Sequence, residues 1–502
     1  MKLNSKMLIG IICFCSIFSN AQNYVPIAPN TSSTEILDAA ISVRPSDRQL
    51  AWQKLEYYAF IHFGPNTFLG NEWGDGTADP SVFNPTALDA NQWVKTIKAA
   101  GMKGLILTAK HHDGFCLWPT QTTDYSVSAS PWRNGKGDLV REVADACQRE
   151  DIKFGIYLSP WDRNHTTYGD SPAYDKVFVA QLTELMTNYG ELFELWFDGA
   201  NGEGPNGKVQ EYDWKAYYDL IRKFQPNAVI AIMGPDVRWC GNEAGKGRDP
   251  EWSVLPVTSN SQRLIAENSQ QNDGEAMFIP KNAKGSDLGS RDLLLNSPAL
   301  IWYPSEVDTS IRPGWFYHAE QDDKVKTPEK LEQIYYSSVG MNASLLLNIP
   351  PDKRGLIHEN DIKNLMALKK KIDTTFKLNL MEKAKISLKK KEAKKLIDGK
   401  LATHYELQTN QKDSTILITF KKPQTFNRLL LQENIAMGQR VETFVFEKME
   451  AGKWIEIAAG KTIGYKRILC FDEVTSSKVR LRITSTRANP LLAEIGIYRS
   501  GE

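Results

Sequence analysis

E-L-W-F-D-G-A, residues 194–200, is the stretch from which the fold of this chain is best predicted. Its short apolar run stops at Asp198 and Gly199, a pattern typical of a buried parallel strand that ends in a turn. Because strand side chains alternate between two faces, Trp196 and Asp198 point to the same side. The stretch therefore predicts a strand that brings one indole and one carboxylate to its carboxyl end.

Similar segments occur on both sides of it. From about residue 46 to 376, short strand-like runs alternate with amphipathic helical stretches, as in parallel α/β proteins. The predicted strands span residues 57–62, 104–109, 154–159, 192–197 and 228–233, and the predicted helices span residues 90–100, 138–150, 173–189 and 214–224. No G-x-G-x-x-G motif follows the first strand, so we predict an α/β fold with a (β/α)8-like TIM barrel rather than an open doubly wound sheet.

Changes in composition suggest the domain boundaries. We expect a catalytic barrel over residues 22–376 and a Lys-rich linker over 377–395, whose charges are most simply explained as a solvated helix face. Over residues 396–502 short alternating strands replace the helical pattern, which predicts a C-terminal antiparallel β-sandwich. The predicted sandwich strands span residues 415–420, 428–432, 443–447, 454–458 and 478–483.

Charge and composition narrow the class of partner. The chain of 502 residues has 61 basic and 60 acidic side chains, a net charge of +1, so nothing favours nucleic acid or an anionic membrane surface as its partner. It has 13 Trp, most of which core packing would explain, although flat apolar faces also suit a neutral carbohydrate. The sequence carries no signal for oligomeric state.

The amino terminus has the three-part form of a secretory signal peptide. Lys2 and Lys6 precede the apolar run 7–18, and small and polar residues follow up to Ala21. We predict that residues 1–21 are removed near Ala21 and that the protein is exported to the periplasm or the extracellular space. No other apolar stretch approaches the roughly 18 residues that a membrane span requires.

Polar and aromatic residues follow each predicted strand, at the end where TIM-barrel enzymes carry their active sites. They are His62, the run His111-His112-Asp113, the pair Trp161-Asp162, Asp198, and the residues Trp239, Glu243 and Glu251 in a long loop after the fifth strand. We expect these side chains to meet at one rim of the barrel.

Asp198 is the first candidate for catalysis, although an Asp-Gly pair can also simply turn the chain. Displacement at an anomeric carbon requires a second carboxyl group, which acts as the acid. The candidates are Glu203, Glu243, Glu251 and Glu306, and local sequence does not rank them firmly. Glu243 lies between glycines that allow a ligand to approach the backbone, and Trp239 could provide apolar surroundings that raise a carboxyl pKa.

Three histidines and one tryptophan have competing interpretations. His62, His111 and His112 could bind a metal, contact sugar hydroxyls, or be satisfied within the core. Adjacent histidines on an extended chain point in opposite directions, which disfavours joint binding of one ion by His111 and His112. Trp315, after a Pro-Gly turn, could form a wall against a sugar or pack in the core.

Several of these motifs together resemble the α-L-fucosidases of glycoside hydrolase family 29. The likeness covers about residues 45–375. It rests on Y-Y-A-F-I-H-F-G-P-N-T-F (57–68), A-K-H-H-D-G-F-C-L-W (109–118), F-G-I-Y-L-S-P-W-D (154–162), E-L-W-F-D-G-A (194–200) and R-P-G-W-F-Y-H (312–318). The resemblance implies a retaining exo-glycosidase that uses no metal or organic cofactor and acts on a fucosylated oligosaccharide or glycoconjugate. It assigns Asp198 as the nucleophile and matches His62, His111, His112 and Trp196 to positions that hold fucose. We also expect Tyr157 and Trp315 to be substrate-binding residues.

The G-N-E-A-G loop at residues 241–245 is similar to that of one branch of the family, which implies that Glu243 is the acid/base. That branch resembles enzymes that prefer α-1,3 and α-1,4 linkages on branched Lewis-type glycans. A retaining mechanism requires the carboxyl groups of Asp198 and Glu243 to lie about 5 Å apart. The last domain looks like a discoidin-type module. The alternatives are a catalytically silent fucose-binding protein and a barrel glycosidase that acts on another sugar.

Overall fold

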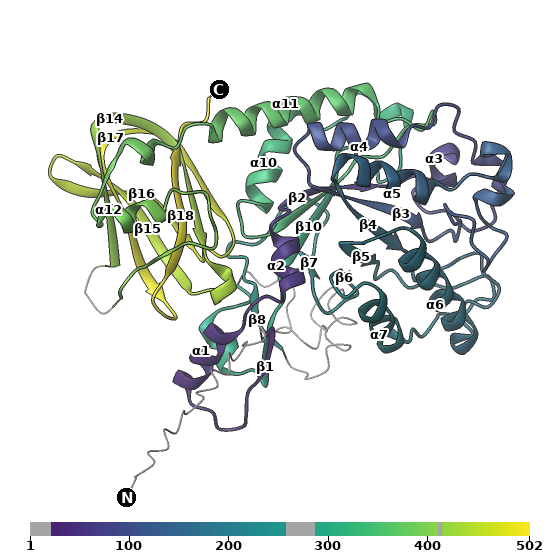
Figure 1. Ribbon diagram of the computed structural model, residues 1–502, viewed down its shortest axis with the longest axis horizontal. Helices are drawn as coiled ribbons and strands as arrows, with labels where there is room; N and C mark the ends of the chain where they lie inside the picture. Colours follow the sequence, from purple (N-terminus) through teal and green to yellow (C-terminus); the bar gives the residue numbers. More distant parts are fainter. Residues whose placement is uncertain (1–21, 258–286, 410–413, 502) are drawn as a thin grey trace, which may run out of the picture.

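The computed structural model describes residues 22–257, 287–409 and 414–501. The predicted signal peptide, residues 1–21, lies outside this part of the chain. Figure 1 shows a barrel and a smaller β-domain side by side, with the long helix α11 running from one toward the other. No helix within the described ranges is long and apolar enough to cross a membrane.

The barrel is a nearly closed sheet of eight parallel strands, which confirms the predicted fold class. Its strand order is β6-β5-β4-β3-β2-β11-β10-β7, and a parallel bridge between Ala231 and Val237 brings its two edges together. The strands are β2 (Tyr57–Ile61), β3 (Gly104–Lys110), β4 (Lys153–Leu158), β5 (Glu194–Phe197), β6 (Val229–Ile232), β7 (Arg238–Trp239), β10 (Ser305–Ser310) and β11 (Ser344–Asn348). The five strands predicted from the sequence are the first five of these.

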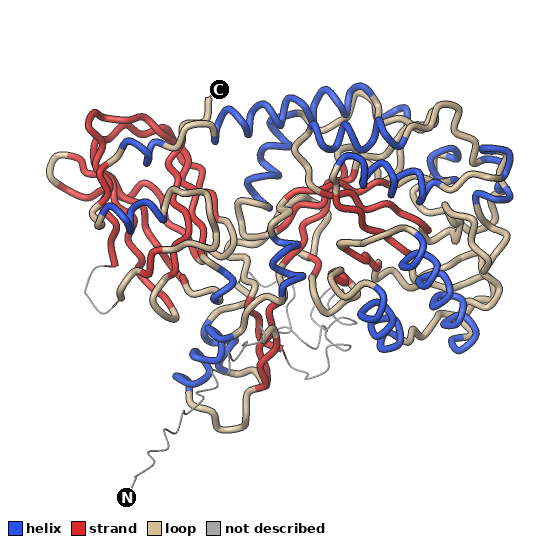
Figure 2. Tube along the Cα trace, in the orientation of Figure 1, coloured by secondary structure: helices blue, strands red, loops and turns tan. Residues whose placement is uncertain are grey.

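Helices cover the outside of the barrel, as Figure 2 shows. They are α4 (Ala90–Ala99), α5 (Leu139–Glu150), α6 (Ser171–Asn188), α7 (Trp214–Phe224), α10 (Pro328–Ser338) and α11 (Glu359–Phe376). Asp89, Asp138 and Asp213 cap α4, α5 and α7 by accepting a hydrogen bond from a first-turn backbone N–H. No helix separates β6 from β7, because the chain turns directly from one to the other and completes the barrel with a two-residue strand.

The strand pattern separates two cores. In β2, Tyr57, Ala59 and Ile61 pack with residues of the surrounding helices, whereas Tyr58 and Phe60 point into the barrel. The interior cluster also contains Trp52, Ile106, Tyr157, Trp196, Val229, Ala231, Ile232, Val237 and Leu346. This alternation follows from the two-residue period of a strand, and it places aromatic residues beneath the carboxyl ends of β4 and β5.

A small layer outside the barrel sheet contacts the second domain. Strands β1 (Tyr24–Pro26), β9 (Ala299–Trp302) and β8 (Val254–Val257) form an antiparallel sheet. Nearby are α1 (Ser33–Ser42), α2 (Asp47–Gln53) and α9 (Arg291–Leu295), and α3 (Pro65–Leu69) follows β2. The segment that includes β1, which we assigned to the barrel from sequence, thus pairs outside the barrel sheet.

The second domain is an antiparallel β-structure. Its strands are β12 (Lys385–Ile386), β13 (Tyr405–Glu406), β14 (Ser414–Glu433), β15 (Val441–Glu450), β16 (Lys453–Lys461), β17 (Arg467–Thr486) and β18 (Leu491–Tyr498). Strands β14 and β17 each run for 20 residues and shift register twice along their pairing. Sequence patterns therefore predicted two strands, 415–420 and 428–432, where the structure has a single irregular one.

The Lys-rich stretch belongs structurally to this second domain. Helix α12 (Lys390–Lys395) has no buried residue, in agreement with a solvated face. Met381 and Ile386, in contrast, are buried in the core of the β-domain, and β12 pairs with β14. Residues 377–395 are therefore packed against the domain rather than extended as a free linker.

The β-domain contacts the barrel at the amino-terminal ends of β2 and β11. Glu56, just before β2, accepts a hydrogen bond from the Tyr465 hydroxyl at 2.9 Å and pairs with Lys466 at 2.7 Å. Asn342, just before β11, accepts a hydrogen bond from the Tyr465 backbone N–H at 2.6 Å. Burial opposes the charge of Glu56, but Lys466 and Lys103 outweigh it and lower the pKa of this carboxyl.

We predict that Glu56→Gln lowers the free energy of unfolding by about 2 kcal/mol at neutral pH, because it removes a partly buried ion pair between the two domains. A carboxyl with a lowered folded-state pKa stabilises the protein above its unfolded pKa and loses that effect as pH falls through the folded value. The difference from wild type should therefore shrink in acid, as thermal melts at several pH values would show. Glu473→Gln, which breaks an exposed pair with Arg499, serves as the control and should change little. Equal effects of the two variants would contradict this account.

Candidate active site

The predicted site residues from four strands meet at the carboxyl rim of the barrel. His62 follows β2, His111 and His112 follow β3, Tyr157 lies in β4, and Trp196 lies in β5. The ring of Tyr157 lies 5.1 Å from that of Trp196, 5.9 Å from that of His111 and 6.1 Å from that of His62, measured between centroids. These segments are distant in the sequence, and parallel pairing of their strands brings them together.

Asp198 stands immediately after β5, with its side chain 31% exposed. Its Oδ1 accepts a hydrogen bond from the Ala200 backbone N–H at 2.8 Å, and its Oδ2 accepts one from the Tyr157 hydroxyl at 3.3 Å. Nε2 of His112 lies 3.7 Å from the same Oδ2. Burial, followed by the charge of Asp198, raises the pKa of Tyr157, so its hydroxyl keeps the proton that it donates. Two hydrogen bonds thus orient the carboxylate, which is still accessible.

The three histidines are uncharged because they are buried. Burial lowers the pKa of His62 to about 3, and it lowers the pKa of His111 well below its usual value. Burial also lowers the pKa of His112, although the charge of Asp198 opposes the effect. Nδ1 of His62 lies 2.9 Å from Oδ1 of Asn348, which can only accept, so this nitrogen carries the hydrogen.

The protonated nitrogen of His112 follows from its neighbours. Ser159 donates its hydroxyl hydrogen to the Trp161 carbonyl at 2.7 Å, and His112 Nδ1 lies 2.8 Å from the same Oγ. The serine oxygen can then only accept from the ring, so Nδ1 of His112 is the donor. Its Nε2 is left with a lone pair on the side of Asp198, where it can accept a hydrogen bond from a ligand hydroxyl.

One geometric expectation for these histidines is wrong. His111 and His112 lie where β3 has already ended and the chain turns, so they do not point in opposite directions as they would on an extended strand. Their ring centroids are 4.3 Å apart. Within the described ranges, no three His, Cys, Asp or Glu side chains are grouped so that they could hold a metal ion.

Glu243 and Trp315 form a second part of the rim. The Trp315 Nε1–H donates to Oε2 of Glu243 at 3.2 Å, and the Trp315 ring lies 5.2 Å from that of His62. Glu243 is on the exposed rim, yet desolvation by the surrounding atoms raises the pKa of its carboxyl. The Trp315 hydrogen bond opposes this shift, and the charges of Asp198 and Glu72 add to it. Glu243 is therefore suited to hold a proton and lies within the field of Asp198.

The loop that carries Glu243 begins one strand later than the sequence suggested. It follows β7, the two-residue strand that the sequence did not reveal, rather than β6. Gly241 has φ +94°, a conformation that favours glycine, and the Asn242 side chain ties the loop by donating to the Lys246 carbonyl at 2.8 Å.

The other three acid candidates have different environments. Glu306 is fully buried beneath Trp196 and accepts its indole N–H at 2.6 Å. Glu251 is buried in an ion pair with Arg238. Glu203 is exposed on the loop after β5, where its backbone carbonyl accepts from Trp161. Of the four, Glu243 contacts the rim residues through its carboxyl group while remaining open.

Two residues of the rim were missed by the sequence reasoning. The carboxylate of Glu72 accepts the Trp315 backbone N–H at 2.7 Å and lies 2.6 Å from Nε2 of His318. Trp73 is 56% exposed, an unusual position for an indole, and lies 5.2 Å from the His112 ring and 5.5 Å from the Trp161 ring. The N-E-W-G run that follows the first strand and α3 was the signal that could have identified them.

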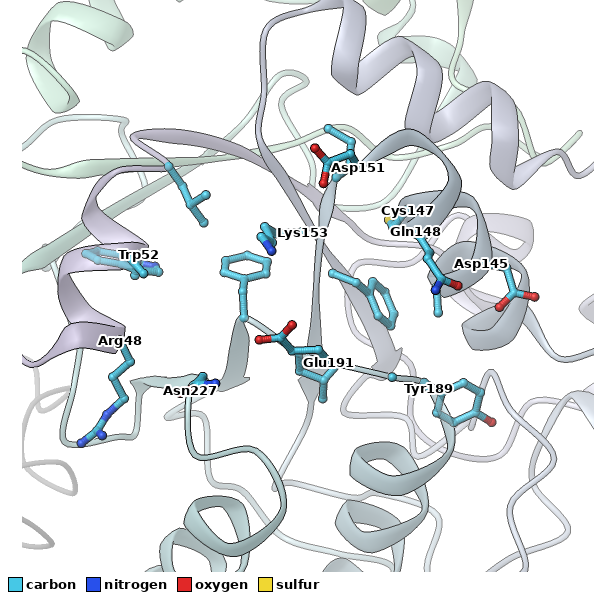
Figure 3. Close-up of a pocket in the computed structure, with 18 of the residues that line it drawn as sticks. Arg48, Trp52, Asp145, Cys147, Gln148, Asp151, Lys153, Tyr189, Glu191 and Asn227 are labelled. Atoms are coloured by element: carbon cyan, nitrogen blue, oxygen red, sulfur yellow. The ribbon is translucent and has the colours of Figure 1, made fainter. Parts of the chain in front are cut away.

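A separate cavity of about 600 Å³ lies at the opposite end of the barrel (Figure 3). Lys153, Leu192 and Asn227, which precede or begin β4, β5 and β6, form part of its wall together with Trp52 and Tyr189. It shares no lining residue with the rim around Asp198, so we do not assign the candidate chemistry to it.

Comparison with known proteins identifies the family of both domains. Residues 47–373 match the family model described as Alpha-L-fucosidase, and residues 383–495 match the F5/8 type C domain. The chain belongs to the α-L-fucosidase family of glycoside hydrolases, and its second domain is of the discoidin-like type.

Three relatives illustrate the similarity. Alpha-L-fucosidase 1 of Arabidopsis thaliana is 40% identical over 99% of this chain and 94% of its own length. A glycoside hydrolase family 29 structure from an unknown rumen bacterium has a TM-score of 0.76 and 41% identity, over 91% of this chain and 78% of that one. A family 29 fucosidase of Ruminococcus gnavus in complex with fucose has a TM-score of 0.80 and 32% identity, over 96% of this chain and 99% of that one.

The environment of Glu243 predicts that two substitutions near it move the basic limb of the pH–rate profile in opposite directions. Where Glu243 supplies a proton, kcat/KM falls as pH rises through its pKa. Trp315→Phe removes a hydrogen bond that favours the ionised carboxyl, so the basic limb should move to higher pH. Glu72→Gln removes a negative charge, so the same limb should move to lower pH. The directions of the two shifts are measured in pH–rate profiles of kcat/KM. Trp73→Phe is the control, because Trp73 faces His112 rather than Glu243. If the basic limb moved in the same direction in Trp315→Phe and Glu72→Gln, the assignment of Glu243 would be contradicted.

Proposed function

We propose that this protein is a retaining exo-α-L-fucosidase that releases terminal L-fucose from α-1,3- and α-1,4-linked branches of Lewis-type glycans. The observation that carries the proposal is the pairing of two unlike carboxyl groups at one rim. Asp198 is open and held by donors, and Glu243 has a raised pKa within its field. Family membership and the fucose complex of the Ruminococcus gnavus relative support the choice of sugar.

In the first step, the Asp198 carboxylate attacks the anomeric carbon while the bond to the leaving oxygen breaks. Glu243 transfers its proton to that oxygen, so the departing sugar leaves as an alcohol. In the second step, the Glu243 carboxylate takes a proton from water as the water oxygen attacks the same carbon. Asp198 is released, and L-fucose leaves with its original anomeric configuration.

The neutral histidines and the aromatic residues hold the sugar in this scheme. Nε2 of His112 accepts a hydroxyl hydrogen, and uncharged imidazoles make these contacts without placing a competing cation beside Asp198. Trp196 and Trp315 provide apolar faces for the ring and its methyl group. The exposed Trp73 extends this surface at the rim.

We predict that Asp198→Ala lowers kcat/KM by at least about a thousand-fold, because the covalent step loses its nucleophile. Added azide should restore turnover of an activated aryl fucoside and yield β-fucosyl azide, whereas Glu243→Ala with azide should yield the α-azide. NMR of the products distinguishes the two anomers. Ordinary activity of Asp198→Ala, or the same anomer from both variants, would overturn the assigned roles.

Linkage preference is tested separately with the wild-type protein. We predict that fucose is released from Lewis-type trisaccharides with α-1,3 or α-1,4 linkages at least about tenfold faster than from α-1,2- or α-1,6-linked fucosides, as a discrimination of about 1.4 kcal/mol would give. Chromatography of the released monosaccharide provides the measurement. Preferential cleavage of α-1,2 or α-1,6 substrates, or release of another sugar, would contradict the proposed specificity.

A further inference from the structure

Two glutamates meet in the interior of the barrel, directly beneath the site. Glu194 begins β5 and Glu306 lies in β10, and both are fully buried. These strands are not neighbours in the sheet, so the two carboxyl groups approach each other across the interior. TIM-barrel interiors are usually filled by branched apolar residues, so a carboxyl pair there calls for a reason.

The contacts of the pair place one proton. Both oxygens of Glu306 accept, one from the Trp196 indole N–H at 2.6 Å and the other from the Tyr58 hydroxyl. Glu194 accepts the Trp52 indole N–H at 2.9 Å on Oε2, whereas its Oε1 has no N–H or O–H donor in the described part of the chain.

Two touching buried carboxyl groups cannot both be charged, so one holds a proton. That proton fits on Oε1 of Glu194, from which it can be donated to Glu306. Burial and the charge of Glu306 raise the pKa of Glu194 well above its usual value, which agrees with this placement.

The network ends on the indole that lies in the site. Trp196 precedes Asp198 by two residues on the same face of β5, and its ring lies 5.1 Å from those of Tyr157 and Phe60. At the other end, Trp52 lines the cavity at the amino-terminal end of the barrel, as Figure 3 shows. The hydrogen bonds thus run through the barrel from that cavity to the floor of the fucose site.

We propose that Glu306, supported by a protonated Glu194, is a positioning residue of the fucose site that fixes the Trp196 indole, and with it the strand end that presents Asp198. The inference rests on the proposed function to the extent that Trp196 and Asp198 meet the sugar. Glu306 itself touches no substrate, because it is fully buried and the Trp196 indole lies between it and the rim.

Two isosteric variants test the direction of the hydrogen bonds. Glu194→Gln keeps the pattern, since its amide donates to Glu306 and its carbonyl oxygen accepts from Trp52, so kcat/KM should stay within about two-fold of wild type. Glu306→Gln turns one acceptor into a donor that faces Trp196 or Tyr58, and kcat/KM and L-fucose affinity should fall by about 10- to 100-fold. If both variants lost activity equally, or if Glu306→Gln kept full activity, the proposal would be overturned.

A double-mutant cycle separates positioning from a general packing effect. Trp196→Phe removes the N–H that Glu306 accepts, so adding Glu306→Gln to it should cost less than about two-fold in kcat/KM. The same further loss in both backgrounds would rule out an action through Trp196.

Glu433→Gln is the matched control, because Glu433 is a buried carboxyl of the β-domain that accepts three backbone N–H groups. It should lower the melting temperature and leave kcat/KM within about two-fold.

A measurement on the folded wild-type protein covers the case in which Glu306→Gln does not fold. With indole-¹⁵N-labelled protein, the Trp196 resonance, assigned by its absence in Trp196→Phe, should be shifted downfield, exchange slowly with solvent and persist in Glu194→Gln. A Trp196 resonance at an ordinary shift in fast exchange would overturn the proposal. Activity that survives Asp198→Ala would instead refute the proposed mechanism. The kcat/KM of Glu306→Gln could then still be compared with that of wild type, so the positioning role would be tested independently.

Discussion

The parallel register of the eight barrel strands is the constraint on which the rest of this structure depends. Pairing aligns Thr108 of β3 with Tyr157 of β4, and Tyr157 with Trp196 of β5. This alignment brings the Tyr157 hydroxyl within reach of Asp198. A slip of one residue in any of these pairings would turn the aromatic side chains toward the helices and separate the rim residues. The site is therefore a property of the closed sheet more than of any single loop.

Environment gives the carboxyl groups of the barrel their different characters. Asp198 is accessible and accepts hydrogen bonds, Glu243 has a raised pKa at the rim, and Glu251 is neutralised by Arg238. Glu306 is as close to Trp196 as a hydrogen bond allows, yet it is sealed from the rim by that indole. The same chemical group thus serves as a candidate nucleophile, a candidate acid, half of an ion pair or an internal anchor, according to what surrounds it.

The β-domain contributes at the other end of the barrel. Its contacts with Glu56 and Asn342 are made where β2 and β11 begin, opposite the rim that carries Asp198. In TIM barrels the carboxyl ends of the strands usually carry the active site, whereas residues at the amino-terminal ends mainly serve stability. The Lys-rich stretch before the domain is part of it, because Met381 and Ile386 are buried in its core.

The sequence alone determined the strand–helix alternation, the barrel class and the candidate Asp198, because these depend on local periodicity and on short motifs at strand ends. Local sequence left four candidates for the acid, and only the family resemblance favoured Glu243 among them. The sequence could not reveal β7, because two residues are too few for a periodic pattern. It divided β14 into two strands, because the exposed residues 421–423 interrupt the alternation between its two halves. The acid candidates could be separated only in three dimensions, because burial and ion pairing depend on residues far away in the chain. Glu306 became an internal anchor rather than an acid for that reason: its partners Tyr58, Trp196 and Glu194 come from other strands, and only the closed barrel brings them together.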